Sequence, residues 1–157
     1  MYAYKTRAEW LDATCPWSML AYSGLSSRKL RELAMACACY GSPAVVVPGN
    51  RKIAEATLTA CRHVMAEDGH SSMAQLRRLA TQCHEVFLKN DTGLADHAAL
   101  AIQHAAKEIC VPTGYGENAA YAAKHAASRL TLPRIPTLIR TMVSWDEIQE
   151  GQKRRKV

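Results

Sequence analysis

The chain has few aromatic residues and no long run of apolar ones. Phenylalanine, tyrosine and tryptophan make up 6% of the 157 residues, and Phe87 is the single phenylalanine. A helix that crosses a bilayer needs about 20 consecutive, mostly apolar residues, and no stretch of this chain provides them. We therefore expect no membrane partner. Alanine supplies much of the apolar content instead, so each core contact should bury little area.

The motifs of several enzyme classes are also missing. Acidic residues occur as neighbours, such as Glu67-Asp68 and Asp146-Glu147, and not as the spaced pairs that hydrolases and two-metal sites use. The Gly114-Tyr115-Gly116 turn opens a helix, but it lacks the lysine and hydroxyl residue of a phosphate-binding loop. We therefore expect no cofactor and no catalytic residues.

The positive charge is concentrated at the C-terminal end. The formal net charge is +6, and four basic residues lie together at 153–156; without them, 16 basic residues face 14 acidic ones. Four adjacent like charges repel one another and favour a solvated segment. We therefore predict a single domain over residues 1–150, which is long enough for one core, followed by a flexible basic tail at 151–157.

Six cysteines raise the question of disulfides or metal. The N-terminal residues lack the apolar core of a signal peptide, so we expect a cytoplasmic protein with reduced thiols. Cys37 and Cys39 are two residues apart, which places them about 200° apart around a helix. Cys83 and His84 are adjacent and diverge by about 100°. Neither pair presents two ligands to one ion, so we predict no metal site and interpret the thiols as small buried groups.

Apolar periodicity and breaking residues predict an all-α fold of about seven or eight helices, as a compact bundle or a short helical array. Leu30, Leu33, Ala34 and Cys37 form one inward stripe at helical spacing. The short segment 44–48, bracketed by two prolines, reads as an extended connector packed on the core. The expected helices cover residues 8–13, 16–22, 27–40, 50–66, 72–89, 94–109, 117–130 and 137–148.

The N-terminal third resembles a known group of sequences. Its segments are Glu9-Trp10-Leu11, Met19-Leu20, Ser27-Arg28-Lys29-Leu30-Arg31 and Ala36-Cys37-Ala38-Cys39. They are similar to the opening of a family of uncharacterised planctomycete-type bacterial proteins, in which capped, alanine-rich helices follow. Leu138-Ile139-Arg140 is similar to a segment that recurs near the end of that helical region. The resemblance implies a bacterial, helical protein and supplies no ligand or catalytic residue.

One departure from the family pattern concerns the end of the 27–40 helix. Family members often carry adjacent cysteines followed by arginine, whereas here Ala38 separates Cys37 from Cys39 and Tyr40 stands where the basic residue would be. The departure argues against a fixed ligand set at this position.

The leading functional hypothesis is a non-catalytic protein-interaction module, an adaptor or subunit of a larger bacterial assembly. Its partner would be another protein or a second copy of the chain. Tryptophan often anchors interfaces, so Trp10, Trp17 and Trp145 are the candidate contacts, although all three could equally pack in the core.

The alternative is a small helical subunit that binds the nucleic-acid backbone. A third reading, a cysteine-dependent enzyme, requires one unusually reactive thiol near a base. The basic residues that would contact phosphate in the alternative are Arg28, Lys29, Arg31, Arg77, Arg78, Lys153, Arg154, Arg155 and Lys156.

Overall fold

The fold consists of helices joined by short connections. A computed structural model of the chain describes residues 4–89, 94–111, 115–127 and 134–155. These contain no strand, which confirms the predicted all-α class. The helices are α1 (Arg7–Leu11), α2 (Pro16–Leu20), α3 (Ser27–Gly41), α4 (Pro48–Ala66), α5 (Met73–Lys89), α6 (Leu94–Cys110), α7 (Glu117–Ala126), α8 (Arg134–Met142) and α9 (Trp145–Arg155), with a 3₁₀ turn, η1, at Ser42–Ala44.

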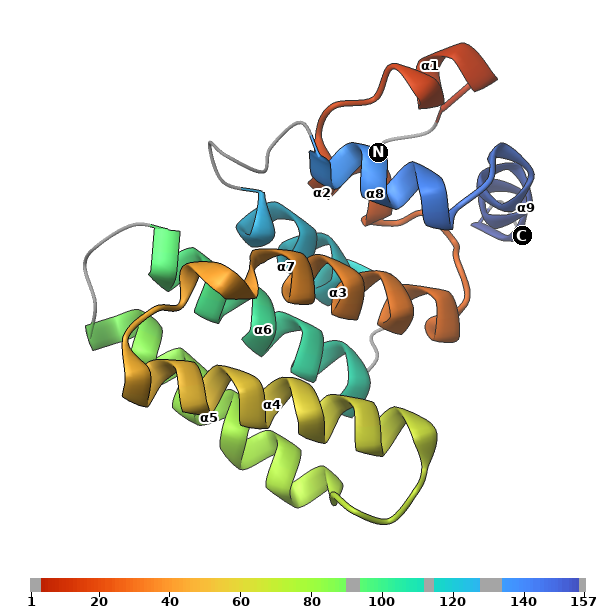
Figure 1. Ribbon diagram of the computed structural model, residues 1–157. Helices are drawn as coiled ribbons and strands as arrows, with labels where there is room; N and C mark the ends of the chain where they lie inside the picture. The colour runs from red at the N-terminus through yellow and green to blue at the C-terminus, as the bar shows by residue number, and fades with distance from the viewer. Residues whose placement is uncertain (1–3, 90–93, 112–114, 128–133, 156–157) are drawn as a thin grey trace.

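Helix α6 lies at the centre of this arrangement. It packs against α5 and α7 as well as α3 and α4, and Figure 1 shows α3 and α4 on one side of it. Helix α2 packs against α7, and α8 packs against both α2 and α3. Within the described residues, no helix is both long and apolar enough to serve as a membrane span.

Serine and threonine side chains determine where several helices begin. Thr6 accepts a hydrogen bond from the Glu9 amide at 3.2 Å, and Ser26 accepts one from the Lys29 amide at 3.2 Å. Ser72 does the same for the Gln75 amide at 3.1 Å. Each bond satisfies an amide that has no partner within the helix.

Alanine on α7 lets this helix lie close to its neighbours. Five of its ten residues are buried alanines, and a Cβ added at Gly41 of α3 would lie 3.3 Å from the Cα of Ala126. The inward stripe predicted on α3 is confirmed, because Leu30, Leu33 and Cys37 are at most 1% exposed. Small residues therefore set the spacing of the core.

The last predicted helix is wrong in extent, because it is two helices. The first ends at Met142, and Ser144 caps the second: its hydroxyl accepts from the Glu147 amide at 3.2 Å, while the Glu147 carboxylate accepts from the Ser144 amide at 2.8 Å. This reciprocal capping box was readable from the sequence. Pro136, expected in a link before the helix, lies in the first turn of α8, where proline is tolerated.

Other segment boundaries also differ from the predicted ones. Helix α4 begins at Pro48, before the expected start at Asn50, because proline is preorganised for the first helical turn. Helix α7 ends at Ala126, short of the expected end at 130, and positions 128–130 lie outside the described residues. The 44–48 connector is only partly packed on the core, since Val45 is buried while Val46 is 73% exposed.

The boundary predicted at residue 150 falls inside α9, so residues 151–155 are not a separate tail. Gly151 lies against Gly24, where an added Cβ would meet the neighbouring backbone. The Arg154 guanidinium donates two hydrogen bonds to the Gly24 carbonyl, at 3.1 and 2.9 Å. The mutual approach of the two glycines and these bonds attach the end of the helix to the body despite the charge repulsion.

Candidate functional site

A groove lies between α3 and α4. Its volume is about 680 Å³, within the range of roughly 300–1,000 Å³ that ligand sites occupy. Methionine and alanine provide its apolar floor, and arginine side chains stand around it. The lining residues are Arg28, Arg31, Glu32, Met35, Ala36, Cys39, Arg62, Met65 and Ala66.

Helical spacing explains why these residues share one surface. The α3 members recur at intervals of three and four residues from Arg28 to Cys39, which keeps them on one face of the helix. The three members from α4 follow the same rule over its last turn. The opposite face of α3 is occupied by α6 and α7, so the groove face is the one that remains for a partner.

The charges around the groove are predominantly positive. Three arginines face one carboxylate, Glu32, which pairs with Arg28 at 3.2 Å. The Arg62 guanidinium donates to the Cys39 sulfur at 3.3 Å, and sulfur is a weak acceptor. The lining therefore offers more hydrogen-bond donors to an anion than its own acceptors occupy.

Arg31 connects the groove to a buried carboxyl group. Its Nε atom is buried without a hydrogen-bond partner, and so are both carboxyl oxygens of Glu108 on α6. Glu108 is 0% exposed, and burial raises its pKa, an effect opposed by the Ala119 backbone amide and the Arg31 charge. The carboxyl group is thus disposed to hold its proton above the usual pH range.

Two of the three tryptophans, Trp10 and Trp145, line the same small hollow, whereas Trp17 does not. Trp10 is 1% exposed, and its ring meets Tyr4 edge-on at 5.3 Å between centroids. Trp17 is half-buried and its ring lies 4.5 Å from that of Tyr121. Trp145 is also half-buried. None of the three lines the groove, so their predicted contact with a partner stays a prediction, and Trp10 in particular packs in the core.

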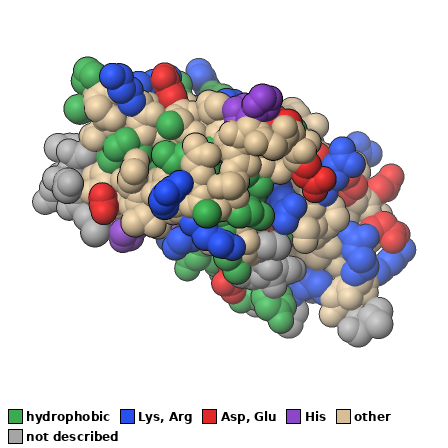
Figure 2. Space-filling model, turned by 90° about the horizontal axis from the view of Figure 1, so that it is seen from below, with side chains coloured by type: hydrophobic (Ala, Val, Ile, Leu, Met, Phe, Trp, Pro, Cys, Tyr) green, Lys and Arg blue, Asp and Glu red, His purple; other side chains and the backbone are tan. Residues whose placement is uncertain are grey.

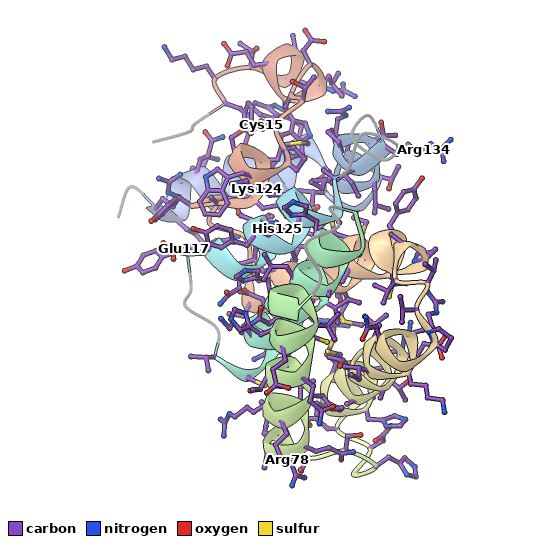
Figure 3. The ribbon with its side chains drawn as sticks, turned by 90° about the vertical axis from the view of Figure 1, so that its left-hand side faces the viewer. Cys15, Arg78, Glu117, Lys124, His125 and Arg134 are labelled. Atoms are coloured by element: carbon purple, nitrogen blue, oxygen red, sulfur yellow. The ribbon has the colours of Figure 1, made fainter. Side chains whose placement is uncertain are left out.

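The basic residues predicted for nucleic-acid binding come from α3, α5 and α9. Figure 2 shows lysine and arginine side chains in several separate groups on the lower face, with acidic side chains among them. Figure 3 places Arg78 at the lower end of the molecule, on α5. Arg77 and Arg31 do share a neighbour, since burial raises the pKa of Cys110 and both guanidinium groups oppose that rise.

Several of these basic side chains are already engaged within the protein. Lys29 pairs with Glu147 at 3.3 Å and donates to the Met142 carbonyl at 2.9 Å. Lys153 pairs with Glu150 at 3.2 Å. The Arg155 guanidinium lies 5.8 Å from the centre of the Tyr22 ring, and position 156 lies outside the described residues.

A second cluster joins three histidines to aromatic rings on α6 and α7. The Nδ1 atoms of His97 and His125 are 3.0 Å apart, so one must carry a proton and the other accept it. The His104 and Tyr121 rings stack at 4.8 Å. Burial, His104, His97 and Lys124 lower the pKa of His125 to about 4, so this imidazole is neutral at pH 7 and a weak base.

The thiols divide into buried and exposed groups. Burial raises the pKa of Cys37 and of Cys61 to about 12, so both are protonated at neutral pH and poor nucleophiles. Cys15 is exposed, and its pKa is lowered: burial raises it, but Ser18, the Trp17 amide and Lys124 outweigh that effect. Figure 3 shows Cys15 and Lys124 in the same upper part of the molecule.

Metal binding finds no geometric support in the described part of the chain, where no three histidine, cysteine, aspartate or glutamate side chains are placed to hold an ion. Sequence reasoning missed the groove, whose α4 side is Arg62, Met65 and Ala66. A signal was present, because these three residues lie outside the inward stripe of their helix at helical spacing. What the sequence did not show is that the face they share with α3 remains uncovered.

No protein-family model, curated protein or solved structure matches this chain.

Proposed function

We propose that the protein is a non-catalytic, helical interaction module, an adaptor or subunit of a larger assembly, and that the α3/α4 groove is its docking face. The observation that carries the proposal is an open, methionine- and alanine-floored groove of about 680 Å³ between two helices that both pack against α6. Grooves of this kind receive apolar side chains of partner helices, and methionine adapts its shape to them.

The chemistry of the remaining clusters supports a binding role over a catalytic one. His125 is neutral and weakly basic at pH 7 because its pKa is about 4, and a general base works best with a pKa near the working pH. The one thiol with a lowered pKa, Cys15, has Lys124 and Ser18 as the neighbours that lower it, whereas an activated cysteine usually pairs with a histidine.

Capture of the partner through matched groove and surface variants tests the proposal. Ala36→Glu places a charged, bulky side chain in the groove, and Ala74→Glu places the same side chain on the exposed surface of α5. Tagged proteins are recovered from the native host and their companions are quantified by mass spectrometry, after circular dichroism shows that both variants fold. We expect a stoichiometric protein that Ala74→Glu retains and Ala36→Glu loses. A companion retained equally by both variants would show that the groove is not the docking face.

Nucleic-acid binding is the second candidate, favoured by the common position of Arg31 and Arg77 near Cys110. A gel shift with duplex and single-stranded DNA at 50 and 200 mM salt tests it. Binding that several phosphate contacts provide should weaken steeply over this range. If no shift occurs even at 50 mM salt, the second candidate is wrong.

A further inference from the structure

We infer that the occupant of the α3/α4 groove is an acidic amphipathic helix of a partner protein, with an apolar stripe flanked by a carboxylate at each end. The inference rests on the proposed function, because it names the partner of the same groove. It adds the charge, the secondary structure and the spacing of the segment that binds.

The arginines stand at opposite ends of the groove. Helices α3 and α4 run in opposite directions (Figure 1). Arg62 of α4 meets Cys39 near the C-terminal end of α3, whereas Arg28 and Arg31 lie near the start of α3. At 1.5 Å per residue, the stretch from Arg28 to Cys39 is about 16 Å long. A ligand that satisfies both ends must therefore carry two separated anionic groups.

Two of the three groove arginines, Arg31 and Arg62, lack a strong acceptor. The Nε atom of Arg31 is buried and without a hydrogen-bond partner, and the Arg62 guanidinium donates to a thiol sulfur, which is a weak acceptor. A buried donor without a partner costs free energy. Carboxylate is the group whose geometry matches a guanidinium in two parallel hydrogen bonds, so it is the natural acceptor to complete them.

The floor of the groove between the arginines is apolar, so it favours a ligand with apolar side chains. Met35 is 7% exposed, and Met65, Ala36 and Ala66 line the groove beside it. A nucleic-acid backbone or a free phosphate would satisfy the arginines and leave this floor uncovered. An apolar segment with acidic ends satisfies both, which favours an acidic peptide over those ligands.

The dimensions favour a helix as the form of that segment. Docked helices insert side chains at positions i, i+4 and i+7, which span about 10.5 Å. Such a stripe fits within the 16 Å floor, and carboxylates one turn before and one turn after it would lie about 2–3 Å beyond the two ends of that floor, where the arginine side chains stand. A helix placed between two antiparallel helices can also pack at the shallow crossing angle that bundles use.

The probe is a synthetic, fluorescein-labelled helical peptide of 18 residues. It carries leucine at i, i+4 and i+7 and glutamate one turn before and one turn after this stripe. Matched peptides replace both glutamates by glutamine, or the three leucines by alanine. Binding to the full chain is measured by fluorescence anisotropy at 50 and 300 mM salt, and the alkylation rate of Cys39 with and without peptide reports whether the groove is occupied.

We expect the glutamate peptide to bind and to slow alkylation of Cys39. The glutamine peptide and the Arg62→Gln protein should each bind about three- to tenfold more weakly, with a smaller dependence on salt. Arg31→Gln should also weaken binding, because Arg31 lines the other end of the groove. Arg78→Gln is the control, since Arg78 is exposed on α5 at the lower end of the molecule (Figure 3) and does not line the groove, and it should bind like the unchanged protein. Arg62 is exposed, so its variant keeps the test open if Arg31→Gln does not fold.

Three outcomes would overturn the inference. Equal binding of the glutamate and glutamine peptides would show that acidic ends are not required. Failure of every peptide to protect Cys39, while Ala36→Glu still loses the host partner, would show that the groove binds something other than this helix and would leave the proposed function standing. Protection of Cys39 by DNA in place of peptide would assign the arginines to nucleic acid.

Discussion

The two faces of α3 are built from similar residues and do different things. The inner face places Leu33, Ala34 and Cys37 at 0% exposure against α6 and α7, where alanine lets the helices approach closely. The outer face carries Met35, Ala36 and Cys39 into an open groove. Small and sulfur-containing side chains occur on both. Their role is thus decided by whether another helix covers them, and not by their identity.

Thiol reactivity should separate the two faces most strongly. Burial raises the pKa of Cys37 to about 12, which at pH 8 lowers its thiolate fraction roughly a thousandfold below that of an ordinary cysteine. Cys39, two residues later, lines the groove. In a Cys15→Ser background, which removes the exposed thiol with a lowered pKa, N-ethylmaleimide should label Cys39 at least about a hundredfold faster than Cys37.

Peptide mapping by mass spectrometry after timed quenching measures both rates in one sample. Labelling in urea is the control. Because urea unfolds the protein and exposes both thiols, the two labelling rates should become similar. Similar rates in the folded protein would show that the inner face is open to solvent.

The two faces of α3 should differ by a smaller amount in how well they tolerate a larger side chain. Ala34→Leu adds three carbon atoms to a site that is 0% exposed, and overpacking of this kind costs about 1–3 kcal/mol of unfolding free energy. Ala36→Leu adds the same atoms in the groove and should change the free energy by about 0.5 kcal/mol or less. Urea unfolding followed by circular dichroism gives both values. An equal loss in the two variants would mean that the groove closes in solution.

The smallest effect on stability should come from Glu108 of α6, the buried carboxyl group near Arg31 of α3. This effect should depend on pH. The pKa of Glu108 is raised by burial, so its contribution to stability is fully present below the unfolded-state pKa of about 4.3 and is lost as pH rises through the higher folded-state pKa. Glu108→Gln removes this loss. We expect it to match the unchanged protein near pH 4 and to be more stable by about 1 kcal/mol at pH 8.

Thermal unfolding from pH 4 to pH 8 measures the difference, with Glu85→Gln on the exposed surface of α5 as the matched control. A stability difference that is constant with pH would show that folding does not raise the pKa of Glu108.

The helices were predictable from the sequence wherever local chemistry defines them. Ser26 and Ser72 cap α3 and α5, and the buried stripe of α3 follows directly from its spacing. The division between α8 and α9 was also encoded locally, in Ser144 and Glu147, and was missed because the apolar pattern continues across it. Errors of this kind come from weighing periodicity above capping.

The candidate site was not predictable in the same way. Arg28 and Arg31 stood out as charged residues, but their relation to Arg62 requires α3 and α4 to lie side by side, some 30 residues apart in sequence. The attachment of α9 depends likewise on the approach of Gly151 to Gly24, which no local pattern encodes. Long-range packing of this kind also decided that Trp10 is covered.

The sequence by itself determined that the chain is helical, where most of its helices begin, and which stripe of α3 is apolar, because hydrogen bonds to caps and the 3.6-residue period act over a few residues. Tertiary structure alone decided which apolar and charged surfaces are covered. That choice depends on which helices meet, and a surface becomes a groove only when two helices share a neighbour, here α6, without filling the space between themselves.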